Sequence, residues 1–400
     1  MNWFATLKKK RYYKFLIWIF LIICLVFLFW RGSLIVTSPE WLKIDDYVEY
    51  WAAGQLNIFG GNPYNPDQLL PLQNEAGRYF GVPVMMWNPP WMLALVMPFS
   101  LFEYPISRTL WILFFIVITF ISSTLIWSLY GGKPRSKWIG WMITFTFIPV
   151  LQAFRTGQTG PLLLLGIVGF LFFLRKDKLF LAGVSLSLLA VKPHILYLYV
   201  IAILIWSLSR KEWRLVLGTG ASLMVATMIA AAVNINVLQQ YLDAFLNYPP
   251  ENWATPTLGG VIRLIFGPEL FWAQFFPPLI GILWLIYYWI KQREMWDWIE
   301  VTPILILVSI FTAAYGWTSD QSVSLVAVLQ IFILLIPLAN NSTRLFVGFS
   351  YLIIDLLLIL PWGNQIWLWW LAPALLVWYL FSKRAFQQNI SPPSSNENNS

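Results

Sequence analysis

Residues 108–130 read RTLWILFFIVITFISSTLIWSLY, an apolar run whose only charge is Arg108 at its first position. A helix needs about 20 such residues to cross the roughly 30 Å hydrocarbon layer of a membrane. Further apolar runs, each a candidate helix, lie at 13–35, 84–102, 138–152, 160–174, 179–191, 195–209, 215–234, 270–290, 299–316, 322–339, 345–361 and 366–382. The pattern predicts an all-α polytopic membrane protein with about 12 transmembrane helices and one re-entrant or short segment.

The composition supports this class. Apolar residues make up 59% of the chain and charged residues 11%, against roughly 25% charged residues in soluble domains. We expect one integral-membrane domain over 1–384 and a Ser/Asn/Pro-rich, disordered cytoplasmic tail over 385–400. Most Lys and Arg residues flank the apolar runs, so their excess does not indicate a nucleic-acid partner. The single cysteine, Cys24, permits neither a disulfide framework nor a cysteine metal site, and we expect no metal and no cofactor.

The basic residues also predict the topology. Lys8, Lys9, Lys10 and Arg11 precede the first run, which has no cleavage site behind it and is expected to be an uncleaved anchor with a cytoplasmic N-terminus. Placing most basic residues on the cytoplasmic side also makes the C-terminus cytoplasmic. An even number of crossings is then required, which is one fewer than the apolar runs.

The run at 84–102 is the best candidate for the segment that does not cross. It begins near the sequence WNPPW and contains Pro98. Broken backbone of this kind is tolerated at membrane depth only where protein or a watery cavity covers it. In the alternative topology, 84–102 crosses the membrane and another run fails to cross.

Three short polar elements fall on the outer face in this topology. They are DDYVEYWAA at 45–53, RTGQTGP at 155–161 and KPH at 192–194. The flanking runs at 160–174 and 179–191 are short for a span, so Gln158 and Lys192 are expected to lie in a recess. Ionisable residues are costly inside a membrane and are therefore candidates for function.

A plain structural interpretation stands beside each candidate. For Asp45 and Asp46 the alternative is a solvated helix N-terminus, and for Lys192 and His194 it is snorkelling to the interface; in both cases a functional role is favoured. Arg155 could equally be an outer-face anchor. For 62–64 and 87–90, turn chemistry with interfacial aromatics is favoured over direct substrate contact. For Asp355, a hydrogen bond between helices and a functional role are equally open.

The residues suit a transfer reaction in which a hydroxyl attacks a sugar carbon and a lipid phosphate leaves. Such a reaction needs a carboxylate as general base and cations or backbone N–H groups on the departing phosphate. Lys192, Arg155 and His194 match the cation role, and Gly157 and Gly160 would permit close approach of an anion. An activated donor supplies the energy, and no Walker or dinucleotide motif is present.

Several motifs over residues 40–200 resemble those of a known family. In order, they are Asp46-Tyr47 with Tyr50 and Ala52-Ala53, Gly61-Asn62-Pro63-Tyr64, Asn88-Pro89-Pro90-Trp91 with Pro98, Arg155 with Gly157-Gln158, and Lys192-Pro193. They look like the C-type-fold glycosyltransferases that use polyprenyl-phosphate mannose. More narrowly, they resemble the bacterial family that includes α-1,2-mannosyltransferases of phosphatidylinositol mannoside synthesis.

This resemblance implies an inverting transfer of a hexose, mannose in the family, from a polyprenyl-phosphate donor to a lipid or glycan acceptor. The site would face the extracytoplasmic side of the bacterial cytoplasmic membrane. The catalytic Asp of the family maps onto Asp46, with Asp45 raising its pKa through like-charge repulsion. Gln158 and Lys192 map near the donor phosphate or sugar. The remaining candidates are Arg155 and His194 on the donor side and Tyr50, Tyr64, Asn88 and Arg263 on the acceptor side.

Two rival classes remain open at this stage. A flippase or transporter of lipid-linked sugars would carry internal repeats with broken helices and a substrate site at mid-membrane. Broken helices are indicated around 87–98 and 155–194, but no two halves share motifs. A non-enzymatic scaffold subunit would need no concentrated polar recess. Besides the donor and acceptor, membrane lipids are the only partners that the sequence predicts.

Overall fold

The computed structural model describes residues 19, 26, 30, 34, 38, 46–79, 81–248, 255–267, 269–337, 341–360 and 364–390. Almost all of the first predicted run, 13–35, lies outside these residues, and so do Asp45 and the tail beyond 390.

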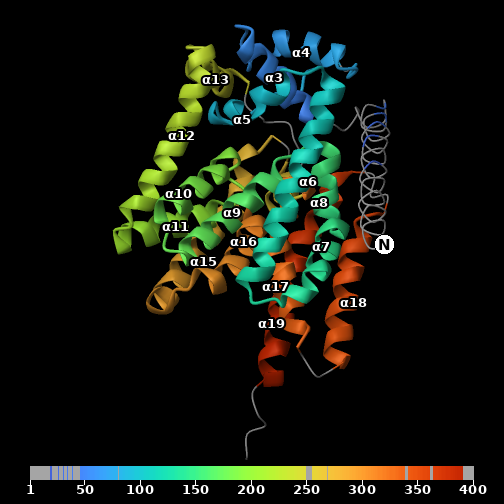
Figure 1. Cartoon of the computed structure of the whole chain (residues 1–400), viewed down its shortest axis with the longest axis vertical. Coiled ribbons are helices and arrows are strands. Elements are labelled where there is room, and N and C mark those ends of the chain that lie inside the picture. Colours follow the sequence, from blue (N-terminus) through green and yellow to red (C-terminus); the bar gives the residue numbers. More distant parts are fainter. Residues whose placement is uncertain are drawn as a thin grey trace, which may run out of the picture.

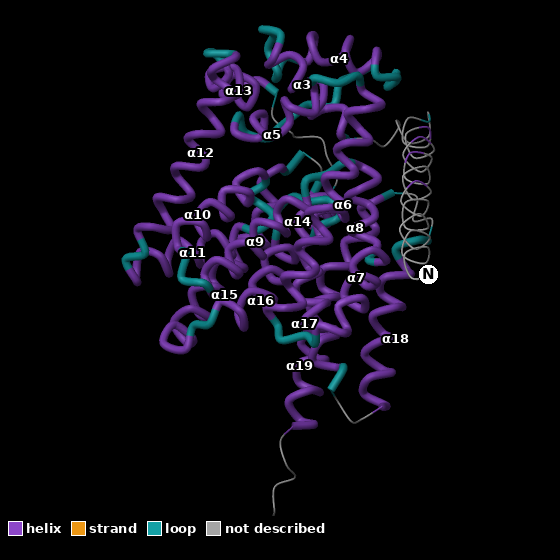
Figure 2. Tube along the Cα trace, viewed as in Figure 1, coloured by secondary structure: helices purple, strands orange, loops and turns teal. Residues whose placement is uncertain are grey.

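Within the described ranges the regular secondary structure is entirely helical, which confirms the predicted class (Figure 2). In chain order the α-helices are α3 (Tyr47–Ile58), α4 (Pro66–Glu75), α5 (Trp91–Ser100), α6 (Tyr104–Leu129), α7 (Lys137–Thr146), α8 (Ile148–Thr156), α9 (Gly160–Arg175), α10 (Leu179–Leu186), α11 (Tyr197–Arg210), α12 (Trp213–Val233), α13 (Val237–Asn247), α14 (Leu258–Phe266), α15 (Phe276–Gln292), α16 (Trp298–Thr312), α17 (Leu325–Leu335), α18 (Asn341–Leu357) and α19 (Leu371–Ile390). The 3-10 helices are η1 (Pro134–Ser136), η2 (Ser187–Val191), η3 (Phe271–Phe275), η4 (Arg293–Met295), η5 (Thr318–Ser324) and η6 (Gln365–Trp370).

Several of these helices have the length and composition of membrane spans. In the described part of the chain, five stretches are long and apolar enough to cross, namely Tyr104–Leu129, Trp213–Val233, Phe271–Met295, Thr318–Leu335 and Gln365–Gln388. Shorter apolar helices of 10–17 residues pack among them. The chain is therefore a polytopic integral membrane protein.

Within the run at 84–102, the residues Trp91–Ser100 form α5, a helix of 10 residues. At 1.5 Å per residue this helix is about 15 Å long, roughly half of the hydrocarbon thickness. The segment is thus short, as the sequence predicts. Whether it enters and leaves by the same face stays a prediction.

One predicted helix is divided in two. The run at 138–152 was expected to be continuous, but α7 ends at Thr146 and α8 begins at Ile148, with Phe147 in an extended conformation between them. Pro149 explains the break, because a proline inside a continuous helix donates no backbone hydrogen bond and its ring clashes with the carbonyl four residues earlier, whereas it is tolerated in the first turn of α8. The Asp355 carboxylate accepts a hydrogen bond of 2.9 Å from the Ile148 N–H, which gives Asp355 a structural role between helices.

The predicted tail boundary is also shifted. The sequence placed the start of a disordered tail at residue 385, whereas α19 continues to Ile390. Residues 385–390 therefore extend the last helix. The rest of the predicted tail, 391–400, lies outside the described residues.

Helices α3, α4, α5 and α13 gather at one end of the molecule, and α6 and α12 run from that end along its length (Figure 1). Aromatic packing holds α3 in place. Tyr47 stacks on Trp111 of α6 with ring centroids 5.2 Å apart, and Phe99 of α5 meets the same indole edge-on at 5.1 Å. The first residues of α3 are thereby fixed against α6, beside the turn that joins α8 to α9.

Candidate active site

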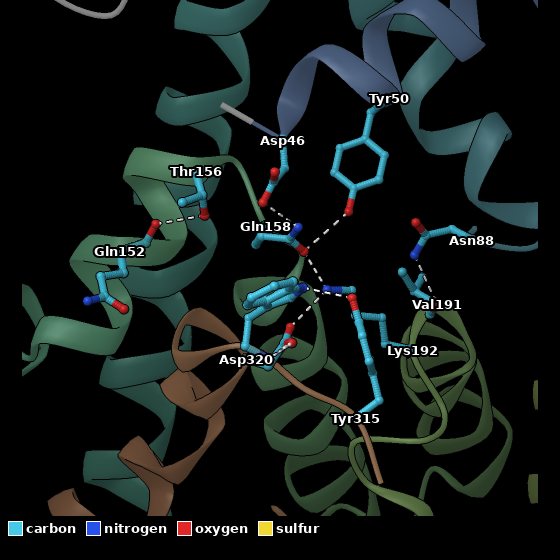
Figure 3. A network of polar contacts seen from close by, with 11 residues as sticks. Asp46, Tyr50, Asn88, Gln152, Thr156, Gln158, Val191, Lys192, Tyr315 and Asp320 are labelled. Atoms are coloured by element: carbon cyan, nitrogen blue, oxygen red, sulfur yellow. Dashed lines mark hydrogen bonds and ion pairs between the residues drawn. The ribbon is translucent and has the colours of Figure 1, made fainter. Parts of the chain in front are cut away.

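Asp46 is the residue directly before α3. Its backbone N–H donates to the Thr156 carbonyl at 2.9 Å, which ties the start of α3 to the end of α8. Its side chain makes no capping hydrogen bond to its own helix. Instead, Asp46 Oδ2 accepts a hydrogen bond of 2.8 Å from Gln158 Nε2 (Figure 3). The carboxylate therefore faces another segment of the chain, unlike that of a solvated helix cap.

Gln158 lies in the turn between α8 and α9 and is buried. Gly157 before it adopts a left-handed conformation with φ of 75°, which ends α8 and turns the chain toward α3. The Gly157 carbonyl accepts a hydrogen bond of 3.0 Å from the Trp111 indole. A Cβ at Gly157 would lie 2.5 Å from the side chain of Tyr47, and a Cβ at Gly160 would lie 2.7 Å from the Ser319 carbonyl. Both glycines thus allow close packing of protein on protein.

The partners of Gln158 fix the orientation of its amide. A carboxylate only accepts hydrogen bonds and an ammonium only donates them, so Nε2 must face Asp46 and Oε1 must face Lys192. Lys192 Nζ donates to Gln158 Oε1, and the Tyr50 hydroxyl donates to the same oxygen at 3.4 Å.

Lys192 follows η2 and is buried, so it does not snorkel to the interface. Its Nζ forms a 3.0 Å ion pair with Asp320 Oδ1. The other carboxylate oxygen, Oδ2, accepts a hydrogen bond of 2.9 Å from the Trp317 N–H at the start of η5. This pair compensates a charge that would be costly if it were buried alone.

Asp320 was not among the residues predicted for the site. It lies in η5, whose residues Thr318–Ser324 are all buried despite the polar sequence TSDQSVS. Asp320 lies two residues before the apolar run at 322–339, and an ionisable residue at such a position is a signal for function. Its place 128 residues from Lys192 gave no indication of the partner.

Four separate segments thus meet in one series of polar contacts, from Asp46 through Gln158 and Lys192 to Asp320 (Figure 3). Asp46 comes from the start of α3, Gln158 from the α8–α9 turn, Lys192 from the end of η2 and Asp320 from η5. Three of the four side chains are buried, and Asp46 is half-buried.

His194 lies two residues after Lys192, near this series. Its imidazole is exposed and meets the Tyr315 ring edge-on, with centroids 5.5 Å apart. Desolvation by the surrounding protein and then the neighbouring Lys192 charge lower the pKa of His194 below its usual 6.5. A lowered pKa favours the neutral imidazole, and the cation role expected from the sequence stays a prediction.

Arg155 lies on the exposed side of the last turn of α8. Its carbonyl, together with that of Phe154, accepts a hydrogen bond from the buried Arg108 of α6, at 2.7 and 3.0 Å. The Arg155 cation also interacts favourably with the negative C-terminal end of the α8 dipole. Arg108 therefore fastens the turn that carries Gln158.

Of the four residues predicted on the acceptor side, Tyr50 belongs to the site and the other three contact other parts of the protein. Tyr50 joins the series through Gln158, as described above. Tyr64 and Asn88 link protein segments, since the Tyr64 hydroxyl donates to the Asn88 carbonyl at 3.2 Å and Asn88 Nδ2 donates to the Val191 carbonyl at 3.0 Å. The guanidinium of Arg263 in α14 lies 5.2 Å from the centre of the Phe271 ring. These contacts of Tyr64, Asn88 and Arg263 fit a structural role.

Glu49 is a further carboxyl group that was not predicted for the site. It lies three residues after Asp46, on the same side of α3, and is 6% exposed. Burial, and then the Asp46 carboxylate, raise the pKa of Glu49 well above its usual 4.5. In the described residues, no group of three or more His, Cys, Asp and Glu side chains has the arrangement of a metal site.

The site therefore contains the half-buried Asp46 carboxylate and the buried Lys192 ammonium, with the Gln158 amide between them. This combination can accept a proton and stabilise a negative oxygen within one site.

One comparison with known proteins places the chain in context. The family model described as Glycosyltransferase family 87 matches residues 87–340, which is more than half of the chain and includes Gln158, Lys192 and Asp320. No curated protein and no solved structure matches.

Proposed function

The chain belongs to glycosyltransferase family 87, and from this premise we propose the reaction and the roles of its residues. The protein transfers a hexose, mannose by the sequence resemblance, from a polyprenyl-phosphate donor to a hydroxyl group of a lipid or glycan acceptor. The anomeric configuration inverts, and the site faces the extracytoplasmic side of a bacterial cytoplasmic membrane. The mannose-specific and polyprenyl-specific parts rest on the motifs over residues 40–200.

In this proposal Asp46 is the general base. The acceptor hydroxyl gives its proton to the Asp46 carboxylate while its oxygen forms a bond to the anomeric carbon of the sugar. The bond from that carbon to the phosphate oxygen breaks, and polyprenyl phosphate leaves with the electron pair. No general acid is required, because the phosphate leaves as a stable anion.

Lys192 stabilises the departing phosphate. An ammonium has three N–H donors, and Gln158 and Asp320 take two of them, so one remains for a phosphate oxygen. Asp320 keeps the buried charge compensated before the donor binds. The positive end of the α9 dipole, which begins at Gly160, adds to the attraction for an anion.

Gln158 sets the relative position of the base and the cation. Its amide contacts the Asp46 carboxylate and the Lys192 ammonium at the same time and lies between these two charged groups. The single observation that supports the proposal best is that the Gln158 amide links the Asp46 carboxylate to the Lys192 ammonium, which comes from a different segment of the chain.

The test is transfer by the purified protein in liposomes, given a labelled polyprenyl-phosphate hexose and membrane lipid extract as acceptor. We expect Asp46→Asn to reduce the release of polyprenyl phosphate by about 10²- to 10⁴-fold, as for the loss of a general base. Asp67→Asn, an exposed carboxylate in the first turn of α4, is the matched control and should retain activity.

Asp46→Asn must keep its melting temperature for the comparison to hold. Undiminished release by a folded Asp46→Asn protein would refute the role of Asp46. Movement of the intact donor across the liposome membrane without release of polyprenyl phosphate would favour a flippase.

A further inference from the structure

A pocket lies at the end of α9 that is far from Gln158. It has a volume of about 530 Å³ and is bounded by the last turns of α6 and α9, by α11 and by the start of α16. Helix α9 has 16 residues and is therefore about 24 Å long, with the turn that carries Gln158 at its beginning and Arg175 of the pocket at its end. The pocket and the candidate active site thus belong to opposite ends of α9.

The pocket end carries the basic residues of this region. Lys176 and Lys178 follow Arg175 and are exposed, which is the charge pattern of a cytoplasmic membrane face. This charge pattern predicts that the pocket lies at the level of the inner-leaflet headgroups.

The pocket walls combine opposite charges with indole rings. Arg175 Nη1 donates to the Leu129 carbonyl at 3.0 Å, which uses one of five N–H donors. Asp297 Oδ1 accepts a hydrogen bond of 2.9 Å from Ile299 as the cap of α16, which leaves the second carboxylate oxygen outside the cap. An exposed cation and an exposed anion thus line the same pocket.

Three tryptophans form much of the remaining surface. The Trp298 ring meets Trp206 and Trp296 edge-on, with centroids 5.7 and 5.4 Å apart. The indole N–H groups of Trp296 and Trp298 are buried and have no hydrogen-bond partner in the part of the chain that the structure describes. The pocket is therefore lined by the faces and edges of these indole rings.

We propose that this pocket binds the headgroup of a phospholipid that carries a phosphate and a primary ammonium, that is, an ethanolamine phospholipid. The Arg175 guanidinium matches the phosphate oxygens, and the Asp297 carboxylate matches the ammonium. Indole faces attract the same cation. The leucines beside the charges, Leu129, Leu171 and Leu174, suit the glycerol and the first methylenes of the acyl chains. The volume lies within the range of about 300–1,000 Å³ of small-molecule sites.

This binding does not depend on the proposed transfer reaction. It is measured with the full-length protein in detergent, titrated with water-soluble dihexanoyl phosphatidylethanolamine by calorimetry, and in parallel with the phosphatidylglycerol and phosphatidylcholine of the same chain length. We expect the ethanolamine lipid to bind at least about tenfold more tightly than the other two, a difference of about 1.4 kcal/mol. Glycerol lacks the ammonium, and choline has no N–H to donate to Asp297.

Two variants locate the site. Arg175→Gln and Asp297→Asn should each weaken the ethanolamine lipid by about tenfold. Asn caps a helix as well as Asp does, so Asp297→Asn removes the charge and keeps the start of α16.

The matched controls are Lys178→Gln and Asp177→Asn, which change exposed charges that do not line the pocket. Asn also tolerates the positive φ of 56° at position 177. Equal affinity for the three lipids would overturn the proposal. The same holds if the controls weaken binding as much as the pocket variants do.

Discussion

At the scale of single residues, the Gln158 amide can both donate and accept hydrogen bonds, which few side chains can do. It donates to the Asp46 carboxylate and accepts from the Lys192 ammonium, and it is buried while doing so. A glutamate at this position would face Asp46 with a second acceptor, and an apolar residue would leave both charged groups without this partner. The geometry of the proposed base and cation therefore depends on one neutral side chain.

Glu49 gives a pH-dependent prediction at the same scale. The pKa of Glu49 is raised in the folded protein, so the folded state holds this proton more tightly than the unfolded state. The contribution of Glu49 to stability is then greatest below its unfolded pKa of about 4.5 and declines as the pH rises toward the folded pKa. We expect Glu49→Gln to lose less thermal stability than the unchanged protein between pH 5 and pH 8.

The measurement is the melting temperature across this pH range in one detergent. Glu75→Gln, at the exposed end of α4, serves as the control and should follow the unchanged protein. Parallel curves for Glu49→Gln and the unchanged protein would mean that Glu49 does not carry this proton linkage.

The sequence predicted part of the site at this scale. Asp46, Gln158 and Lys192 follow from short motifs in which polar residues interrupt apolar runs, and the structure brings all three together. Asp320 stands close to an apolar run, but its pairing with Lys192 depends on tertiary packing that no local pattern encodes. Glu49 follows Asp46 at the i, i+3 spacing of a helix face and could have been selected by that rule.

At the scale of elements, the turn between α8 and α9 is fixed from several sides. Arg108 and Trp111, one turn apart on α6, donate to carbonyls of Phe154, Arg155 and Gly157, and the start of α3 donates to Thr156. The position of Gln158 thus follows from α6 and α3 as much as from its own turn.

Gly157→Ala tests this fixation. A left-handed backbone costs an L-residue about 1–2 kcal/mol, and the added Cβ would also meet Tyr47 at 2.5 Å. We expect a lower melting temperature and slower sugar transfer, because the turn that carries Gln158 must move.

Gly220→Ala is the matched control in α12. No atom lies within 4 Å of its Cβ position, and alanine stabilises a helix interior relative to glycine by about 0.8–1.0 kcal/mol. Its melting temperature and transfer rate should be unchanged or higher. If Gly157→Ala behaved like Gly220→Ala, the turn would not constrain the site.

Helix boundaries show where sequence patterns succeed and fail for elements. The runs at 108–130 and 215–234 match α6 and α12 closely, because each is long, apolar and free of internal proline. The run at 138–152 breaks at Phe147, where Pro149 outweighs the continuous hydrophobicity. Hydropathy predicts that a segment is apolar, but it does not report a change of direction inside the segment.

At the scale of the whole molecule, two different polar regions lie at opposite ends of α9. One contains Asp46, Gln158, Lys192 and Asp320, and the other contains Arg175 with exposed lysines. The distribution of basic residues predicts that the second end is cytoplasmic and the first extracytoplasmic.

Cysteine labelling tests this orientation in intact cells. In a Cys24→Ala background, single cysteines replace the exposed residues Asp67 of α4 and Lys133 before η1. We expect a membrane-impermeant thiol reagent to label Asp67→Cys in intact cells and Lys133→Cys only after permeabilisation. The reverse pattern would contradict the extracytoplasmic location of the site.

The central claim is that Asp46 and Lys192 act on one lipid-linked sugar. An experimental structure of the protein with bound polyprenyl phosphate and acceptor tests it most directly. Our account predicts a phosphate oxygen about 3 Å from Lys192 Nζ and the acceptor hydroxyl at hydrogen-bonding distance from the Asp46 carboxylate. Polyprenyl phosphate bound away from Lys192, with Asp46 facing no substrate, would contradict it.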